Sequence, residues 1–217
     1  MKKGIWWTQA GLAVVLTLFL IGVSVVGTLA FRPLYYGDIE ELQIEEESGY
    51  SEEEIRQNYD ALIDYNMAWE DETLVLPTIP MSENGRTHFA EVKDIFDVFK
   101  YLAVICGILG SLGIWYMQRK KEYLYLKMTA VVACGLPLVL GFFAAVCWQQ
   151  LFTWFHKLVF DNEYWVFDYR KDPVILILPD TFFLHCALLI FGGVLLGAAL
   201  CQIAYLLLQW RSKRRIA

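Results

Sequence analysis

Charged residues are scarce in this chain of 217 residues, where Asp, Glu, Lys and Arg make up 19% of the sequence. About a quarter is usual in soluble proteins. Hydrophobic residues make up 57%, which argues against a soluble two-domain enzyme and against a disordered chain. The net charge of −6 argues against a nucleic-acid partner that depends on positive charge. The composition predicts a membrane protein that binds no nucleic acid.

Several familiar motifs of enzymes and metal sites are also missing. The chain has no Gly-x-Ser-x-Gly, the mark of a serine hydrolase with a nucleophile elbow, and no His-Glu-x-x-His zinc motif. Its five cysteines show no Cys-x-x-Cys spacing, and all of them fall within apolar runs. Neither a disulfide framework nor a zinc ribbon is predicted, and the cysteines are interpreted as small apolar residues.

Four apolar runs are long enough to predict transmembrane helices, at about residues 8–31, 101–117, 128–152 and 181–210. The second run is extended by apolar residues from Ile95 onward. The first is too long for the apolar core of a signal peptide and is predicted to be an uncleaved anchor. Apart from His185 the runs hold no ionisable residue, which argues against a proton-coupled transporter or ion pump.

Basic residues indicate which ends of these runs face the cytoplasm. They gather at the N-terminus (Lys2, Lys3), between runs two and three (Arg119, Lys120, Lys121, Lys127) and at the C-terminus (Arg211, Lys213, Arg214, Arg215). The positive-inside rule makes these segments cytoplasmic. The acidic segments 32–100 and 153–180 are then extracellular.

The expected fold is an all-α membrane protein. It has a bundle of four transmembrane helices and a small, mainly helical extracellular domain between helices 1 and 2. The predicted regions are the N-terminus with helix 1 (1–31), the acidic extracellular domain (32–94), helices 2 and 3 with their basic loop (95–152), an extracellular active-site segment (153–180), and helix 4 with its basic tail (181–217). Gly193 and Gly197 predict close helix packing, and Gly135 and Pro137 predict a bend in helix 3.

Within the first outer segment, residues up to about Glu47 alternate apolar and acidic side chains, which indicates an extended, strand-like stretch. A Ser-x-x-Glu capping box at Ser51 then predicts a helix over 52–68. Its acidic face is read as a solvated surface or, alternatively, as a site for a basic partner. The apolar, proline-bounded residues 73–80 predict a loop lying against the bilayer surface.

Two of the three histidines, His88 and His156, lie at membrane boundaries on the predicted outer side. They are candidates for a shared site, whereas His185 is interpreted as a packing residue. With no protein nucleophile evident, the expected chemistry is acid/base catalysis in which one imidazole is a neutral base and the other carries a proton and stabilises an oxyanion. A zinc site formed with an acid such as Glu91 or Asp168 is the alternative.

The tract His88-Phe89-Ala90-Glu91-Val92-Lys93 resembles a bacterial four-helix membrane family that includes the lipoprotein intramolecular transacylase. Further resemblance extends over nearly the whole chain: Phe155-His156 to Phe160, then Asn162, Trp165 and Asp168, Pro179-Asp180-x-Phe182-Phe183, Asn58-Tyr59, and Leu62-Ile63-Asp64-Tyr65. The family often has Asp at the place of Glu91, and an Asp-Pro pair where this chain has Asp168-Tyr169.

The resemblance implies transfer of the sn-2 acyl chain of a diacylglyceryl-modified cysteine to that cysteine's own α-amino group, which gives a lyso-form lipoprotein. The implied partners are the lipoprotein N-terminus and membrane lipids, with no cofactor and no metal. His156 is then expected to be the general base and His88 the stabiliser, or the reverse. Glu91 and Asp168 are candidates to orient imidazoles, Asn162 to donate to the oxyanion, and Trp165 to shape the pocket. A non-enzymatic scaffold or sensor, whose acidic outer domain binds a partner, remains the alternative.

Overall fold

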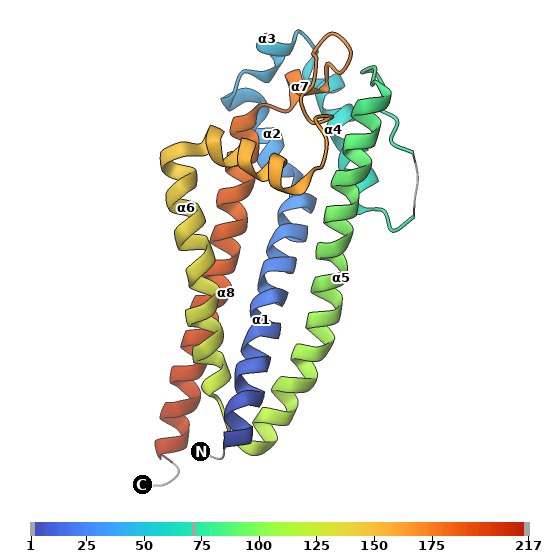
Figure 1. The fold of residues 1–217 in the computed structure, drawn as a ribbon. Coiled ribbons are helices and arrows are strands. Elements are labelled where there is room, and N and C mark those ends of the chain that lie inside the picture. The colour runs from blue at the N-terminus through green and yellow to red at the C-terminus, as the bar shows by residue number, and fades with distance from the viewer. Residues whose placement is uncertain (1–2, 71–72, 215–217) are drawn as a thin grey trace. The chain divides into compact units, whose positions relative to one another are not determined.

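The computed structural model describes residues 3–70 and 73–214, and within them the regular structure is entirely helical (Figure 1). The helices are α1 (Lys3–Ala30), α2 (Arg32–Glu41), α3 (Ile44–Ser48), α4 (Glu52–Met67), α5 (Glu83–Lys120), α6 (Leu124–Val159), α7 (Val174–Ile177) and α8 (Asp180–Arg214). Of the basic residues used to orient the chain, Lys2 and Arg215 lie outside the described residues.

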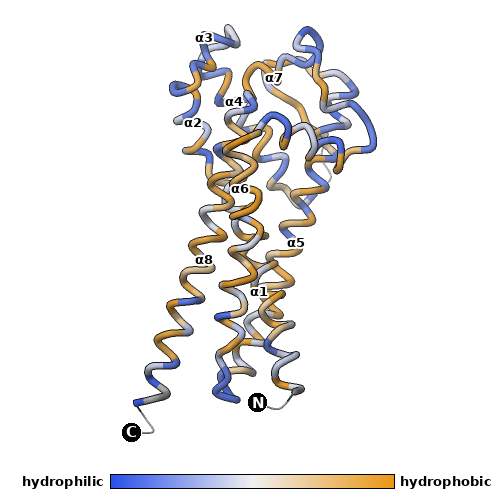
Figure 2. Tube along the Cα trace, turned by 60° about the vertical axis from the view of Figure 1, so that its left-hand side comes forward, coloured by the Kyte–Doolittle hydropathy of each residue, from blue (hydrophilic) through white to orange (hydrophobic). Residues whose placement is uncertain are grey.

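Four helices, α1, α5, α6 and α8, are long and apolar enough to cross a membrane, and each contains one of the four predicted runs. Hydrophobic residues predominate along most of their length, whereas α2 and α3 are largely hydrophilic (Figure 2). Large apolar side chains on these helices are exposed, among them Leu112 (60%), Leu138 (62%) and Leu196 (63%). So much exposed apolar surface is typical of helices that face lipid.

By their internal contacts the residues divide into two compact units. The first comprises Met1–Val25, Phe99–Phe142 and Leu189–Ala217, and the second comprises Val26–Val98 and Phe143–Leu188. The first therefore holds segments of the four long helices. The second holds α2, α3, α4 and α7, the remaining segments of the long helices, and every candidate site residue.

In the first unit small residues let helices approach closely. A Cβ added at Gly197 of α8 would lie 2.4 Å from a methyl of Leu20 in α1, and one at Gly193 would lie 2.8 Å from Oγ of Ser24. The predicted packing role of these two glycines is therefore confirmed. Gln9, fully buried in α1, accepts a hydrogen bond from the Tyr125 amide at 3.0 Å and so satisfies the first turn of α6.

The core of the second unit gathers around α4, whose predicted capping box is present with both of its hydrogen bonds. Ile55, Tyr59, Leu62 and Asn66 lie on one helical face and are buried, as their spacing predicts. Tyr59 stacks on Tyr35 of α2 with ring centroids 3.7 Å apart.

Two expectations for this unit are wrong. The stretch expected to be extended, up to Glu47, forms α2 and α3, because Tyr35, Asp38 and Ile39 lie together on one buried helical face. The loop expected to lie on the bilayer, residues 73–80, instead buries Leu74, Leu76 and Ile79 in the core. Asn58 of α4 holds this loop, since its Oδ1 accepts hydrogen bonds from the amides of Thr78 (3.2 Å) and Ile79 (3.3 Å).

Helices α5 and α6 carry the two candidate histidines. As predicted, α5 runs without a break from its polar first turns into its apolar run. Helix α6 keeps Pro137 within the helix, but its dihedral angles depart from helical values at Cys147 (φ −147°, ψ 53°). The interruption therefore falls ten residues after Pro137, where a bend was expected. Beyond Cys147 the chain continues as a short helical stretch that contains His156 and ends at Val159.

Candidate active site

His88 lies in the second turn of α5, before the apolar run begins, and only 5% of its surface is exposed. Its ring makes edge contacts with Phe160 (centroid distance 4.8 Å) and Phe167 (5.5 Å). Burial among these rings, helped by the nearby His156, lowers the pKa of His88 from 6.5 to about 4. The imidazole is therefore neutral at pH 7.

His156 lies in the last turn of α6 and is fixed by its own helix. Its Nδ1 is 2.8 Å from the carbonyl oxygen of Phe152, one turn earlier. A carbonyl oxygen only accepts, so Nδ1 carries the proton and Nε2 holds the lone pair of the neutral ring. Burial lowers the pKa of His156 as well, although this hydrogen bond opposes the effect. The tautomer makes Nε2 a proton acceptor.

The two imidazoles lie together in an aromatic environment, with ring centroids 6.1 Å apart and planes tilted by 34°. Both contact Phe160, and Trp165 covers His156 at 4.8 Å. The structure thus brings together the two histidines that the sequence analysis selected, and their shared catalytic role stays a prediction. Burial opposes the protonated imidazole that we expected for one of the two, so the arrangement favours two neutral rings, one accepting a proton and one donating through N–H.

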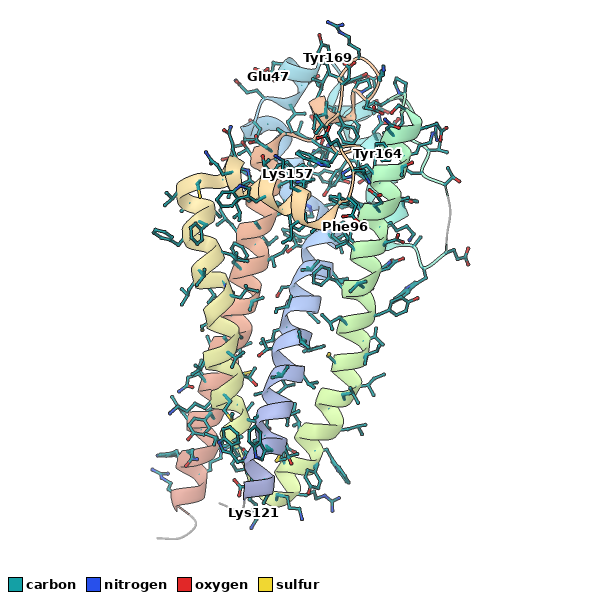
Figure 3. All side chains as sticks on the ribbon, in the orientation of Figure 1. Glu47, Phe96, Lys121, Lys157, Tyr164 and Tyr169 are labelled. Carbon is teal, nitrogen blue, oxygen red and sulfur yellow. The ribbon has the colours of Figure 1, made fainter. Side chains whose placement is uncertain are left out.

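Glu91 and Asn162 contact each other and make no hydrogen bond to either imidazole. The amide Nδ2 of Asn162 donates to Oε1 of Glu91 at 2.8 Å, and its Oδ1 accepts from the Tyr164 amide at 2.9 Å. The Asn162 carbonyl accepts from the indole of Trp165 at 3.2 Å. Asn162 therefore links α5 to the loop that follows α6 and covers His156. Figure 3 labels Lys157 and Tyr164, which precede and follow Asn162 in the chain.

Asp168 does not make the contact expected of it, which was to orient an imidazole. Its side chain is exposed, and its Oδ1 accepts a hydrogen bond from the Arg170 amide at 3.1 Å. Its carbonyl accepts from the amides of Lys171 and Asp172, both at 2.8 Å. These contacts stabilise a turn, and the side chain does not orient an imidazole.

Asp172, which the sequence analysis did not select, anchors the loop to the start of α5. It is 4% exposed and accepts hydrogen bonds from both the amide and the hydroxyl of Ser82, each at 2.7 Å. The Ser82 hydroxyl accepts in turn from the Gly85 amide at 3.1 Å, an N-terminal cap. A Cβ at Gly85 would lie 2.4 Å from Oδ1 of Asp172, so any larger residue there would have to displace the Asp172 carboxylate. The Ser-Glu-Asn-Gly start of α5 was the available signal.

A second buried acid that sequence reasoning missed is Asp38 in α2, with 2% of its surface exposed. Both of its carboxylate oxygens lie 2.9 Å from Nδ1 of His185. His185 was interpreted as a packing residue, and the structure gives it this polar partner in addition. The acid lay hidden in a stretch that had been expected to be extended.

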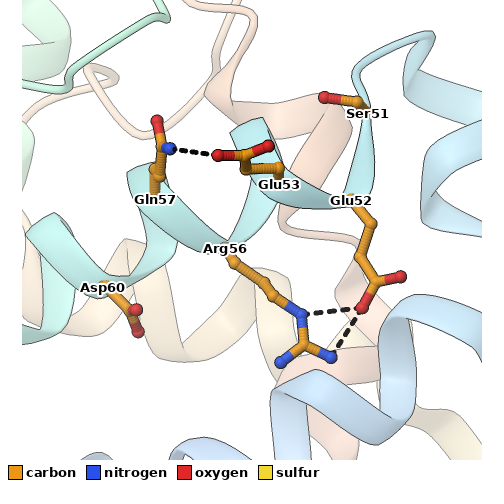
Figure 4. Close-up of a pocket in the computed structure, with 6 residues that line it drawn as sticks. All are labelled: Ser51, Glu52, Glu53, Arg56, Gln57 and Asp60. Carbon is orange, nitrogen blue, oxygen red and sulfur yellow. Dashed lines mark hydrogen bonds and ion pairs between the residues drawn. The ribbon is translucent and has the colours of Figure 1, made fainter.

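The histidine site has no metal-binding geometry among residues 3–70 and 73–214, where no group of three His, Cys, Asp or Glu side chains could hold an ion. A separate surface depression lies on α4 and is lined by Ser51, Glu52, Glu53, Arg56, Gln57 and Asp60 (Figure 4). Arg56 pairs there with Glu52 and Gln57 with Glu53, so its polar groups largely satisfy one another. None of the candidate catalytic residues lines it.

The chain is similar over nearly its whole length to known proteins. A family model described as lipoprotein intramolecular transacylase Lit matches residues 10–183. A crystal structure of the membrane-integral lipoprotein intramolecular transacylase Lit from Bacillus cereus is 33% identical, covers 97% of each chain and has a TM-score of 0.93.

In a second structure of the Bacillus cereus protein a histidine is replaced by arginine; it is 32% identical, has a TM-score of 0.87 and covers 96% of this chain and 93% of its own. In a third structure a histidine is replaced by alanine; it is 33% identical, has a TM-score of 0.86 and covers 97% of this chain and 95% of its own. No curated protein matches the sequence. With four helices able to cross a membrane and membrane-integral structural relatives, the chain is a multi-pass membrane protein.

Proposed function

The chain belongs to the lipoprotein intramolecular transacylase (Lit) family of membrane enzymes, and we propose that His88 and His156 carry its reaction. The reaction moves the sn-2 acyl chain of a diacylglyceryl-cysteine lipoprotein to the α-amino group of the same cysteine. The observation that supports this most is the pair of adjacent neutral imidazoles, one of which has Nε2 fixed as a proton acceptor.

In this proposal His156 is the general base. As the amine nitrogen attacks the ester carbonyl carbon, an N–H proton moves to Nε2 of His156 and the carbonyl π electrons move to oxygen. Because an α-amino group has a pKa of about 7.7–8.0, a neutral imidazole removes its proton at modest cost. Both reacting groups belong to one molecule, so proximity supplies much of the rate enhancement.

His88 is the stabiliser. It donates through N–H to the oxyanion of the cyclic tetrahedral intermediate as a neutral imidazole, since burial disfavours its cation. Collapse then breaks the bond between the carbonyl carbon and the sn-2 oxygen, which takes the proton from His156. The products are an N-acyl amide and a free sn-2 hydroxyl, and no acyl-enzyme forms.

The other side chains support the two histidines. Trp165 shapes the pocket by covering His156, and Asn162 holds the covering loop to α5 through Glu91. Exposed aromatic residues next to the site, among them Trp154 (61%) and Phe155 (49%), suit a position at the membrane interface, where acyl chains enter.

The orientation in the membrane is also a proposal. Both termini and the loop between α5 and α6 are cytoplasmic, and residues 32–94 and 153–180 form the extracellular part that carries the site at the outer leaflet. Basic residues at the cytoplasmic ends support this orientation. Protease or thiol-reagent access to tags inserted near Glu47 and near Lys121 tests it, since only the first tag should react in intact cells.

Substitution of each histidine tests the catalytic proposal. His88→Ala and His156→Ala should each lower transacylation by about 10²–10⁴-fold while the protein remains folded. Mass spectrometry of a lipoprotein N-terminal peptide from cells that express each variant measures the product. A scaffold or sensor would retain its partner in both variants and would leave the acyl arrangement of the lipoprotein the same with or without the protein.

A further inference from the structure

We propose that Glu91 binds the α-ammonium group of the substrate cysteine and thereby restricts the enzyme to lipoproteins with a free amino terminus. The inference rests on the proposed function and adds a recognition residue to it. It gives Glu91 a ligand, in place of the imidazole that the sequence led us to expect.

Glu91 has one satisfied and one unsatisfied carboxylate oxygen. Oε1 accepts from Asn162 at 2.8 Å, whereas Oε2 is buried and receives no hydrogen bond from any residue within 3–70 or 73–214. A buried carboxylate oxygen without a donor is costly, and buried polar atoms nearly always have a hydrogen-bond partner. The bond from Asn162 also restricts rotation of the carboxylate, so Oε2 is held in place to receive a donor.

His88 presents a second unsatisfied atom on the same face of α5. Its Nδ1 is buried and has no hydrogen-bond partner among the described residues. Glu91 follows His88 by three positions, about one helical turn, so the two side chains share a face of the helix. A substrate bound along this face of α5 would therefore meet a carboxylate oxygen as well as the two imidazoles. A primary ammonium, with one positive charge and three N–H donors, is the substrate group that suits the carboxylate.

The charges around Glu91 leave its carboxylate available. Lys93, the basic residue nearest in sequence, is 3% exposed and donates to the carbonyls of Tyr65 and Ala68 at the end of α4. Asp94 is exposed. Burial keeps the pKa of His88 low, so that ring does not supply a competing cation.

This arrangement gives Glu91 a role at both ends of the reaction. At the start, the carboxylate holds the ammonium, whose first proton passes through Nε2 of His156 to solvent. The resulting amine stays hydrogen-bonded to Glu91 and attacks the ester; its second N–H proton passes to Nε2 of His156 and from there to the sn-2 oxygen, so Glu91 itself gains no proton. At the end, the amide nitrogen is uncharged and keeps a single N–H, so the charge attraction to Glu91 is lost. The same contact that selects a free amine therefore favours release of the N-acylated product.

The test measures binding separately from turnover. In a His156→Ala background, which should bind without reacting, the affinity of a diacylglyceryl lipopeptide with a free amino terminus is compared with that of its N-acetylated form. Glu91→Gln should weaken the free-amine lipopeptide about 10- to 100-fold, as expected for loss of a charge-assisted hydrogen bond, and should leave the acetylated form unchanged. Gln retains an oxygen that can accept from Asn162. Asp94→Asn, the same change on the exposed face of α5, should alter neither affinity.

Equal loss for both lipopeptides, or no loss for either, would overturn the assignment. Should Glu91→Gln fail to fold, the comparison is made on the ligand instead. A lipopeptide that lacks the amino group should bind the His156→Ala protein as weakly as the acetylated form, and equal binding of all three lipopeptides would also refute the role. Turnover by the unsubstituted enzyme is assayed in parallel. If no acyl chain moves, the proposed function fails; if transfer occurs but Glu91→Gln keeps full amine preference, only the inference about Glu91 fails.

Discussion

The contact between Asp172 and Ser82 should control both the stability of the second unit and the position of His88. Asp172 accepts two hydrogen bonds of 2.7 Å from Ser82 and is 4% exposed, so each is a largely desolvated bond to a charged group. Such bonds contribute about 1.5–3 kcal/mol each, and Asp172→Ala removes both. Allowing for partial replacement by water at Ser82, we expect a loss of about 3 kcal/mol. For a chain of this size that lowers Tm by about 6–12 °C.

The consequence for catalysis follows from distance along α5. His88 lies six residues after Ser82, less than two helical turns, so loosening the N-terminal cap shifts the imidazole. Because a displacement of about 1 Å can cost about 100-fold in rate, kcat should fall by about 10- to 100-fold in Asp172→Ala. Thermal unfolding in detergent and initial rates with a diacylglyceryl lipopeptide measure the two effects.

A double-mutant cycle makes the prediction sharp. Asp172→Ala and Ser82→Ala together should destabilise by about 2 kcal/mol less than the sum of the single variants, since either one alone breaks the shared contact. The exposed Asp161→Ala serves as the control and should leave Tm unchanged. Additive effects, or a Tm for Asp172→Ala equal to that of the unsubstituted protein, would refute the reasoning.

Four further predictions follow from the site and its surroundings. The pKa of His88 is about 4 in the folded protein and 6.5 in the unfolded chain, so the unfolded chain binds more protons between these pH values. The Tm should therefore decrease as the pH falls from about 6.5 to about 4, and His88→Gln should show a smaller decrease. Asp38→Ala leaves His185 without its buried partner and should lower the free energy of unfolding by about 3 kcal/mol. A Tm within about 2 °C of that of the unsubstituted protein would contradict the pairing. Gly85→Ala should destabilise by about 1–3 kcal/mol because its Cβ meets Asp172, while Gly27→Ala, with nothing within 4 Å, should not. A chelator should leave the rate of acyl transfer unchanged, whereas the zinc alternative requires its loss.

Long apolar runs and local spacing were sufficient to predict the four long helices and α4. The four runs lie in α1, α5, α6 and α8, and the capping box at Ser51 starts α4 where expected. These features depend on local sequence, because a spanning helix must satisfy its own backbone and a cap acts within one turn. The strand-like interpretation of the residues before Glu47 failed because the apparent alternation there coincided with a buried helical face that includes the acidic Asp38 beside Tyr35 and Ile39.

The two histidines were identifiable because the sequence holds only three histidines and these two lie close to the ends of apolar runs. The polar contacts of the second unit were not predictable, since each joins residues far apart in the chain: Asn162 to Glu91, Ser82 to Asp172, and Asp38 to His185. Asp168 and Asp172 look alike in sequence, yet one caps an exposed turn and the other is buried against α5. Only the tertiary fold distinguishes them.

The most direct test of the central claim is an isotope crossover experiment with the purified enzyme. Two diacylglyceryl lipopeptides of different peptide mass are mixed, and only one carries a deuterated sn-2 acyl chain. The account predicts that the deuterium appears on the α-amino group of that same peptide, and that no deuterium reaches the other peptide at any conversion. Label on the second peptide, or an acyl chain bound covalently to the enzyme, would contradict intramolecular transfer by two histidines.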